Sequence, residues 1–302
     1  MDLSILVCTY NRSDFLYKCI ISIINQTETR EEKIEIVIVD NNSHDNTNQV
    51  VNELKEKYRT KIRYIIEKKQ GISYSRTTGA KESEGEFIAC VDDDAIINKD
   101  WLETLFKNIR TIDAEVFGGP IYPNFEIECP DWIDQDYFIR RYRSGDGYLN
   151  KITSQTGFSG GNMCIKKIIF EKIGYFDQTF GMKGSKMGLG EEPDFFYRLY
   201  NSNLQARLYN IDKMSITHFE AKFKLKREYL KDRISLSSVQ FSNRIIHEKG
   251  LLGFLIVFAK LLKQTLGCLI NLILNNKFRY LKNKWIITGL VSVIFKKKEL
   301  PK

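Results

Sequence analysis

The chain has 302 residues, of which 43% are hydrophobic and 12% aromatic, and its formal net charge is +8. This length allows one large α/β domain with an appendage or two modest domains, and the apolar content excludes a chain that is disordered throughout. The basic balance suits nucleic acid, anionic lipid or phosphate-bearing substrates, and it does not choose among them.

The N-terminus and the cysteines bear on the compartment. Residues 3–7 form a short apolar run that follows Asp2 and ends in polar residues, so they predict a first buried strand and not a signal peptide. The six cysteines are widely scattered, with no CxxC pair and no metal-ligand spacing. This usage fits a reduced cytoplasmic setting better than secretion.

Short apolar runs rich in β-branched residues alternate with helical patterns in the first third of the chain. The runs predict strands over residues 3–8, 34–39, 62–66 and 87–91, and the patterns predict helices over residues 14–25, 46–57 and 75–83. Such alternation predicts an α/β fold with a mainly parallel sheet flanked by helices. Ligands gather at the carboxyl ends of the strands in these sheets, so the polar residues that follow the strands are the candidates for a site.

The amino-acid composition changes twice further along the chain. From about residue 116 to residue 218, glycine, proline and aromatic residues become more frequent and the strands less regular. After about residue 219 the chain is helical and basic. We therefore expect one domain over residues 1–220, with halves at 1–115 and 116–220, and a helical, basic and apolar extension over residues 221–302.

The strand expected at 87–91 runs directly into three carboxylates, Asp92, Asp93 and Asp94. Their mutual repulsion is large unless a cation relieves it, and oxygen ligands suit Mg²⁺ or Mn²⁺. Asp92 and Asp94 would point the same way if the chain is extended there. The alternative is a solvated acidic turn, which is the commoner meaning of an isolated triplet.

Two other segments supply polar groups at strand ends. Asp40 follows the strand at 34–39 and could accept hydrogen bonds from a base or a ribose; the structural alternative is a turn before the next helix, and the two interpretations are compatible. Arg76 opens a helix in the loop between Gly71 and Gly79. An arginine beside the backbone donors of a helix start suits a diphosphate, while a surface ion pair is the ordinary alternative.

Together these segments resemble the family 2 glycosyltransferases, with all elements in family order from about residue 4 to residue 218. The opening SILVCTYNR resembles the family's first strand and nucleotide loop, and VDNNSHDNT resembles its VDDGSxDxT element, with Asp40 at the nucleoside-contacting aspartate. Arg76 and Gly79 match its aRNxG element, and Asp92 to Asp94 match its DxD metal motif. The segments FSGGNM and IGYFD resemble its acceptor-side elements.

The resemblance extends to the segment GLGEEPDFFYR. Glu192 falls on the aspartate that acts as general base in the family, with glutamate in place of aspartate, and Glu191 is the competing candidate. An acidic helix N-terminus is the structural alternative for both residues. His218 follows a late strand, where the family often has a histidine that faces the metal or the diphosphate, although a lone histidine is more often structural.

The resemblance implies a GT-A fold with a nucleotide-sugar half and an acceptor half. It also implies an inverting displacement that moves a sugar from a nucleotide-diphosphate donor, most commonly a UDP-sugar, to a hydroxyl of a glycan or lipid-linked acceptor in cell-surface polysaccharide biosynthesis. Mn²⁺ or Mg²⁺ would be held by Asp94, Asp92 and His218. The donor would be bound by a larger set: Thr9, Tyr10, Asn11, Arg12, Asp40, Asn42, Arg76, Asp92 and Asp93.

The C-terminal extension suggests a membrane surface. On a helical wheel of about 100° per residue, the apolar segment 251–274 has a wide apolar face and a thin polar stripe that includes Lys260 and Lys263. We expect peripheral membrane contact through residues 251–298 at the inner face of the cell membrane, and no nucleic acid partner. The two lysines argue against a spanning helix. A helical cap or a dimer face is the alternative.

Two rival functions use the same features. A nucleotidyltransferase should have a glycine-rich loop with a basic residue just after the first strand, and the loop here reads TYNR without glycine. A non-catalytic basic module that binds membrane or nucleic acid fits the charge. It leaves the aspartate triplet and the Glu191–Glu192 pair unexplained.

Overall fold

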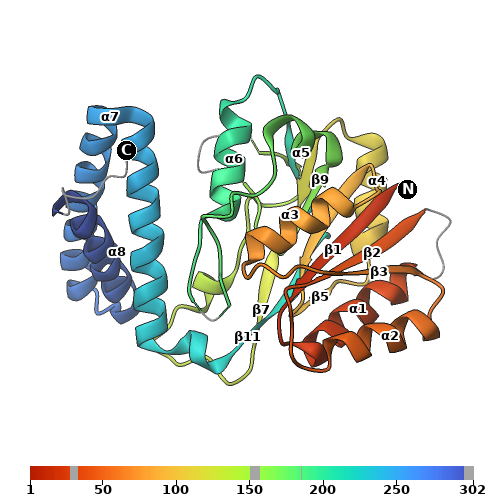
Figure 1. Cartoon of the computed structure of the whole chain (residues 1–302). Coiled ribbons are helices and arrows are strands. Elements are labelled where there is room, and N and C mark those ends of the chain that lie inside the picture. The colour runs from red at the N-terminus through yellow and green to blue at the C-terminus, as the bar shows by residue number, and fades with distance from the viewer. Residues whose placement is uncertain (28–32, 150–156, 185, 296–302) are drawn as a thin grey trace. The chain divides into compact units, whose positions relative to one another are not determined.

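The computed structural model describes residues 1–27, 33–149, 157–184 and 186–295, and the chain divides into two compact units. The first unit comprises Met1–Asn124, Phe138–Lys186 and Glu191–Phe219. The second unit comprises Phe125–Tyr137, Met187–Gly190 and Glu220–Lys302. The domain boundaries expected from the sequence remain predictions. Figure 1 shows the elements in chain order.

An eight-stranded sheet forms the centre of the first unit, in the order β3-β2-β1-β4-β9-β6-β10-β8. Strands β3, β2, β1 and β4 pair in parallel, and so do β6 and β10, whereas β9 is antiparallel to β4 and β6, and β8 is antiparallel to β10. The expected α/β sheet is therefore confirmed, parallel through its first four strands and mixed beyond them. The strands are β1 (Leu3–Thr9), β2 (Ile34–Asp40), β3 (Lys61–Ile66), β4 (Phe87–Asp92), β6 (Val116–Gly118), β8 (Gly147–Tyr148), β9 (Asn162–Lys166) and β10 (Leu208–Asn210).

A second, three-stranded sheet has the order β5-β11-β7. Its strands are β5 (Ala95–Ile97), β7 (Ile121–Phe125) and β11 (Ile216–Glu220). Strand β5 follows β4 after a short turn, and β11 pairs with it antiparallel, so that His218 lies opposite Ala95. This pairing brings a late strand to the end of β4.

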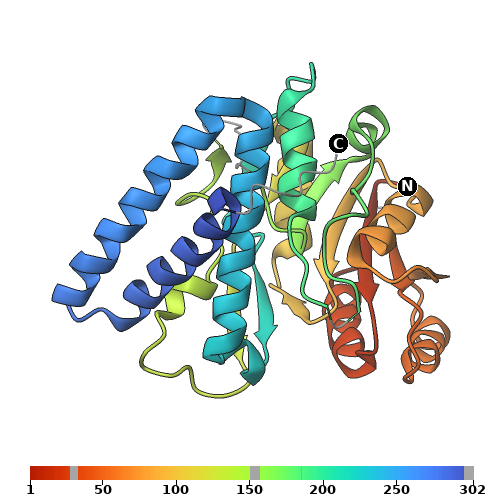
Figure 2. The ribbon, with the colours of Figure 1, turned by 60° about the vertical axis from the view of Figure 1, so that its left-hand side comes forward.

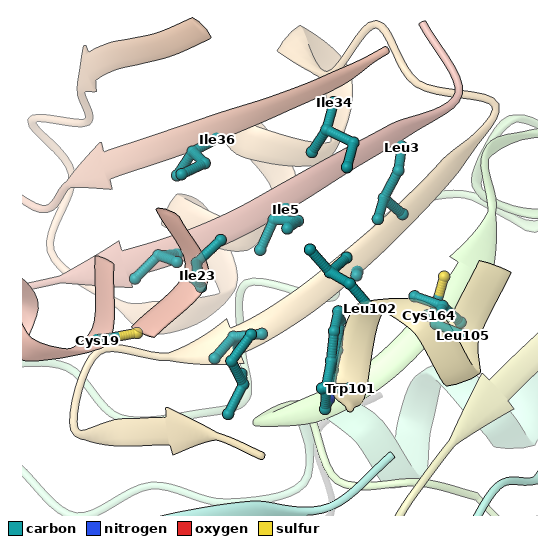
Figure 3. Close-up of a cluster of buried hydrophobic side chains, with 14 of the residues drawn as sticks. Leu3, Ile5, Cys19, Ile23, Ile34, Ile36, Trp101, Leu102, Leu105 and Cys164 are labelled. Atoms are coloured by element: carbon teal, nitrogen blue, oxygen red, sulfur yellow. The ribbon is translucent and has the colours of Figure 1, made fainter. Parts of the chain in front are cut away.

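Helices cover both faces of the large sheet, because its strands carry apolar side chains on both sides. On one face, Leu3 and Ile5 pack with side chains from α1 (Ser13–Thr27), α2 (Thr47–Lys57) and α4 (Trp101–Thr111), as Figure 3 shows in part. On the other face, Leu6 packs with side chains from α3 (Ile72–Glu82), α5 (Lys167–Ile173) and α6 (Glu191–Asn201). The alternation along β1 thus divides the core into two layers.

The four strands and three helices expected in the first third of the chain all form, with small differences at their ends. The largest difference is at α3, which begins at Ile72 and not at residue 75. Gly71 precedes it with a φ of 143°, a conformation that favours glycine, and its carbonyl accepts the first helical hydrogen bonds from Tyr74 and Ser75. The backbone of Gly71 therefore starts the helix early.

The second unit contains mainly helices: η1 (Gln135–Phe138) except its last residue, η2 (Lys222–Leu225), α7 (Arg227–Ile273) and α8 (Lys277–Phe295). The expected helical extension is confirmed. Gly250 has φ 52° and ψ −124°, which interrupts α7 and divides it into a first arm and a second arm. The chain folds back at this point, and again before α8 (Figure 2). The lysine run at residues 296–298, part of the expected membrane contact, lies outside the described residues.

Candidate active site

The carboxyl ends of the first parallel strands bring the expected site residues to one edge of the sheet. In the register of these strands, Thr9 lies beside Asp40 and Cys8 lies beside Asp92. Parallel pairing makes this inevitable, because every strand of a parallel set ends at the same edge. The loops after β1, β2 and β4 therefore meet there.

Asp92, Asp94 and His218 form a group of possible metal ligands, since one ligand atom from each lies within 4.8 Å of the others. The His218 Nε2 atom lies 3.1 Å from Asp94 Oδ1 and 3.8 Å from Asp92 Oδ2. The chain is not extended through the triplet, because β4 ends at Asp92 and residues 93–94 form a turn into β5. The turn and the pairing with β11 bring the three groups together. Two carboxylates and one imidazole are donors that suit a divalent metal ion.

Asp93 points to different partners from its two neighbours. Its carboxylate accepts a hydrogen bond from Thr9 Oγ1 at 2.8 Å and another from Arg12 at 3.2 Å. Arg12 also lies 2.9 Å from Asp94 Oδ2. Burial raises the pKa of Asp93 to about 7, although the charge of Arg12 opposes this. Thr9, Arg12 and Asp93 were expected to bind the donor, and in the structure they join the loop after β1 to the aspartate triplet.

Asp40 is buried and both of its oxygens have protein partners. Oδ1 accepts the backbone N–H of Ser43 at 2.8 Å, and Oδ2 accepts the Tyr64 hydroxyl at 2.5 Å. Asn11 and Asn42 have φ values of 53° and 63°, in the left-handed region that asparagine tolerates. Asn11 donates its N–H to Ser43 Oγ at 2.8 Å, which ties the loop after β1 to the loop after β2. Tyr10, before Asn11, is half-buried.

Asn41 is an organising residue that the sequence analysis did not single out. Its side-chain amide donates to the carbonyls of Glu67 at 3.0 Å and Lys69 at 2.7 Å, and its Oδ1 accepts the Gly71 N–H at 2.7 Å. One buried side chain thereby fixes the loop that leads into α3. The signal in the sequence is weak, because two adjacent asparagines after a strand read as an ordinary turn.

Arg76 connects the metal ligands to the acidic pair. It is only 5% exposed, and its guanidinium lies 3.2 Å from each of three carboxylates, those of Asp92, Glu191 and Glu192. Gly160 makes room for it, because a Cβ at that position would lie 2.4 Å from the guanidinium carbon. The guanidinium donates hydrogen bonds to all three of these carboxylates, so the group expected to bind a diphosphate joins the metal ligands to the acidic pair.

Glu191 and Glu192 occupy the first turn of α6 but differ in environment. For Glu191, burial and then the charge of Glu192 raise the pKa to about 8, and its Oε2 accepts no hydrogen bond from any described residue. Burial raises the pKa of Glu192 as well, but the charge of Arg76 and the N–H of Gly160, 2.9 Å away, outweigh it and leave that pKa below its usual value. At neutral pH the first glutamate is therefore largely protonated and the second ionised.

Aromatic and basic residues between the aspartate triplet and the acidic pair of the sequence have different surroundings. Arg140 donates to Ser159 Oγ at 3.0 Å, and the Tyr142 hydroxyl accepts the Ser159 N–H at 2.7 Å, so both support the loop before Gly160. Arg141 donates to the Tyr122 hydroxyl at 2.6 Å. Trp132 belongs to the second unit.

Comparison with known proteins identifies the family of the chain. The sequence model of the family described as "Glycosyl transferase family 2" matches residues 4–174. The chain is 27% identical over 213 residues to the glucosyl-dolichyl phosphate glucuronosyltransferase of Haloferax volcanii, covering 70% of this chain and 67% of that protein. It is 29% identical over 206 residues to the GalNAc(5)-diNAcBac-PP-undecaprenol beta-1,3-glucosyltransferase of Campylobacter jejuni, covering 66% of this chain and 64% of that protein.

A solved structure supports the fold. The mannosyltransferase PcManGT from Pyrobaculum calidifontis, in complex with GDP-Man and Mn²⁺, matches with a TM-score of 0.63 at 14% identity, over 98% of this chain and 88% of that chain. At this identity the likeness concerns the fold alone, which is the GT-A fold expected above. The nucleotidyltransferase and the non-catalytic basic module considered above are therefore set aside. Since the family's sequence model covers more than half of the chain, the protein belongs to glycosyl transferase family 2 and is a glycosyltransferase.

Proposed function

We propose that the protein is an inverting, metal-dependent glycosyltransferase that uses a nucleotide-diphosphate sugar, a UDP-sugar by preference. The observation that carries this proposal is the continuous chain of charges from the metal-ligand group through Arg76 to Glu192. In this proposal a cation site and an ionised carboxylate both adjoin one buried guanidinium. That is the arrangement needed to stabilise a leaving diphosphate and to deprotonate an acceptor.

In this proposal Asp92, Asp94 and His218 hold Mn²⁺ or Mg²⁺. Bound there, the ion supplies positive charge that offsets the charge developing on the departing nucleoside diphosphate. Glu192 takes the proton from the acceptor hydroxyl while the acceptor oxygen bonds to the anomeric carbon and the bond from that carbon to the phosphate oxygen breaks. Attack from the face opposite the leaving group inverts the anomeric configuration.

The two carboxylates of the acidic pair suit different tasks. Glu192 is ionised at neutral pH and partly accessible, as a general base must be. Glu191 is buried and largely protonated at neutral pH, so it is the poorer proton acceptor there. We therefore assign the base to Glu192 and give Glu191 a supporting role toward Arg76.

We propose a glycan or lipid-linked acceptor at the inner face of the cell membrane. The two relatives are named for dolichyl phosphate and undecaprenol substrates, which are lipid-linked. One helix, α7, has the length and composition that could cross a membrane. These observations favour an enzyme that works next to a membrane, with cell-surface polysaccharide or a related glycan as the product.

The test begins with binding. The purified chain is titrated with UDP, dTDP, GDP and CDP, with and without Mn²⁺, and followed by thermal stabilisation. We expect one nucleotide to bind in a metal-dependent way, and Asp94→Ala to abolish that dependence. Glu53→Gln removes an exposed carboxylate on α2 and serves as the control.

The matching sugar nucleotide is then supplied with lipid-linked acceptors, and the anomeric configuration of the product is read by NMR. We expect Glu192→Gln to bind the nucleotide normally and to transfer sugar at least about a hundredfold more slowly. Failure of every nucleotide to bind under any metal condition would refute the donor site. A product that retains the anomeric configuration would refute the single displacement.

A further inference from the structure

The second arm of α7 carries a continuous row of exposed apolar side chains. Each member of the row is more than half exposed, from 54% to 83%: Leu251, Leu255, Leu262, Leu266, Leu269 and Ile273. Their spacings of three, four and seven residues place them on one face of the helix. We call this row the apolar stripe. Soluble monomers rarely expose so many large apolar side chains side by side.

The opposite face of the same arm is already used for packing inside the second unit. Val257 is fully buried and packs with Ile245 of the first arm and Leu290 of α8. A Cβ at Gly253 would lie 2.1 Å from the Ile245 carbonyl oxygen, so the two arms approach closely there. The apolar stripe is therefore the face left over after the helix has packed against its own unit.

Lys260 does not interrupt the apolar stripe. Its Nζ lies 3.4 Å from the centre of the Phe241 ring on the first arm, and burial lowers its pKa. From the sequence, this lysine argues against a spanning helix; in the structure its side chain points toward the first arm of α7. Lys263 is exposed, and by helical spacing it lies at the border of the apolar stripe.

The part of the chain that carries the apolar stripe is strongly basic. Residues 220–302 carry 18 lysine and arginine residues against 5 aspartate and glutamate residues, while residues 1–219 carry 28 against 33. Lys277, Arg279 and Lys284 are exposed on α8, directly after the second arm. An exposed apolar row on a strongly basic part of the chain complements an anionic bilayer. A second copy of the chain would bring like charges together.

We infer that the second arm of α7 lies in the plane of an anionic membrane surface, with the apolar stripe at the boundary between headgroups and acyl chains. A spanning orientation would require this arm to leave Ile245 and Leu290, against which it packs. The inference deepens the proposed function, because it names the surface that would bring the enzyme to a lipid-linked acceptor. Only this biological role of the surface rests on the proposed function. Vesicle binding itself requires no donor and no acceptor.

The test is flotation of the full chain with vesicles of phosphatidylcholine alone or mixed with phosphatidylglycerol. We expect binding to the anionic vesicles and little to the neutral ones, with a clear decrease as salt is raised. The double variant Leu262→Glu, Leu266→Glu should lower binding at least about tenfold, because charge enters the acyl boundary. The variant Thr288→Glu adds a charge at an exposed site on α8 and should bind nearly as wild type does.

Several outcomes would overturn the inference. Absence of binding to anionic vesicles would do so, and so would equal binding by the double variant. Protein that stays with the vesicles after alkaline carbonate extraction would indicate a spanning helix. A dimer in light scattering that the double variant dissociates, without any vesicle binding, would assign the apolar stripe to a second copy. Metal-dependent nucleotide binding by the double variant would show that the catalytic unit is intact, which separates this failure from a failure of the proposed function.

Discussion

Replacing Arg76 by methionine should destabilise the protein more than the loss of any surface ion pair. The side chain is 5% exposed, and it lies 3.2 Å from the carboxylates of Asp92, Glu191 and Glu192. Methionine fills much of the same volume but removes the positive charge that contacts all three carboxylates. Breaking a buried ion cluster by removing one partner costs about 3–5 kcal/mol, because the remaining charges are left uncompensated. For a unit of this size the melting temperature should fall on the order of 10 °C.

The defect should depend on pH in a defined direction. Without Arg76, burial raises the pKa of Glu192 in the folded protein above its value in the unfolded chain, and the pKa of Glu191, which burial already raises, rises further. A group with a raised folded pKa contributes its stability below the unfolded pKa and loses it as pH rises through the folded pKa. The difference from wild type should therefore be largest near about pH 8 and smaller near about pH 5.

The assay is urea unfolding of wild type and variant at both pH values, with Arg207→Met as the matched control. Arg207 also contacts two carboxylates, those of Asp113 and Glu115, but at the surface, where ion pairs contribute little. If Arg76→Met lowers the free energy of unfolding no more than Arg207→Met does, the charge cluster does not stabilise the fold as argued. A deficit that is equal at the two pH values would contradict the assignment of its cause.

Three further changes test the site. In Gly161→Ala the new Cβ would lie 2.2 Å from Asp92 Oδ2, so Mn²⁺ affinity measured by calorimetry should fall at least about tenfold; unchanged affinity would remove Asp92 from the ligand set. Glu192→Gln should lower kcat by a factor of about 10²–10⁴ and leave nucleotide affinity unchanged. If Glu191→Gln lowers kcat by that factor and Glu192→Gln does not, Glu191 is the general base. Because the pKa of Glu191 in the folded protein is raised, wild type loses stability as pH rises from 4.5 toward about 8. The variant Glu191→Gln lacks this loss, so its melting temperature relative to wild type should increase across that range. An increase confined to acid pH would mean that the pKa of Glu191 is lowered and not raised.

The sequence was sufficient to predict the first half of the sheet and the edge at which the site lies. Runs of β-branched residues and helical periodicity are local properties, and they gave β1 to β4 and α1 to α3 with small errors at the ends. Parallel pairing then brought Asp40 and Asp92 to the same edge without knowledge of any side-chain contact. The motif around Asp92 was visible because it is contiguous.

Other features depended on the tertiary structure because their parts are far apart in the chain. Arg76 meets Glu192 across 116 positions, and His218 meets Asp94 only because β11 pairs with β5. The protonation difference between Glu191 and Glu192 arises from burial and from the placement of one guanidinium, which adjacent identical residues cannot reveal. The inward turn of Lys260 likewise followed from the fold-back at Gly250. Composition and spacing determined which chemical groups were present and on which strands. Packing decided which charged groups interact with one another, because electrostatic energies depend on distance and burial and not on order along the chain.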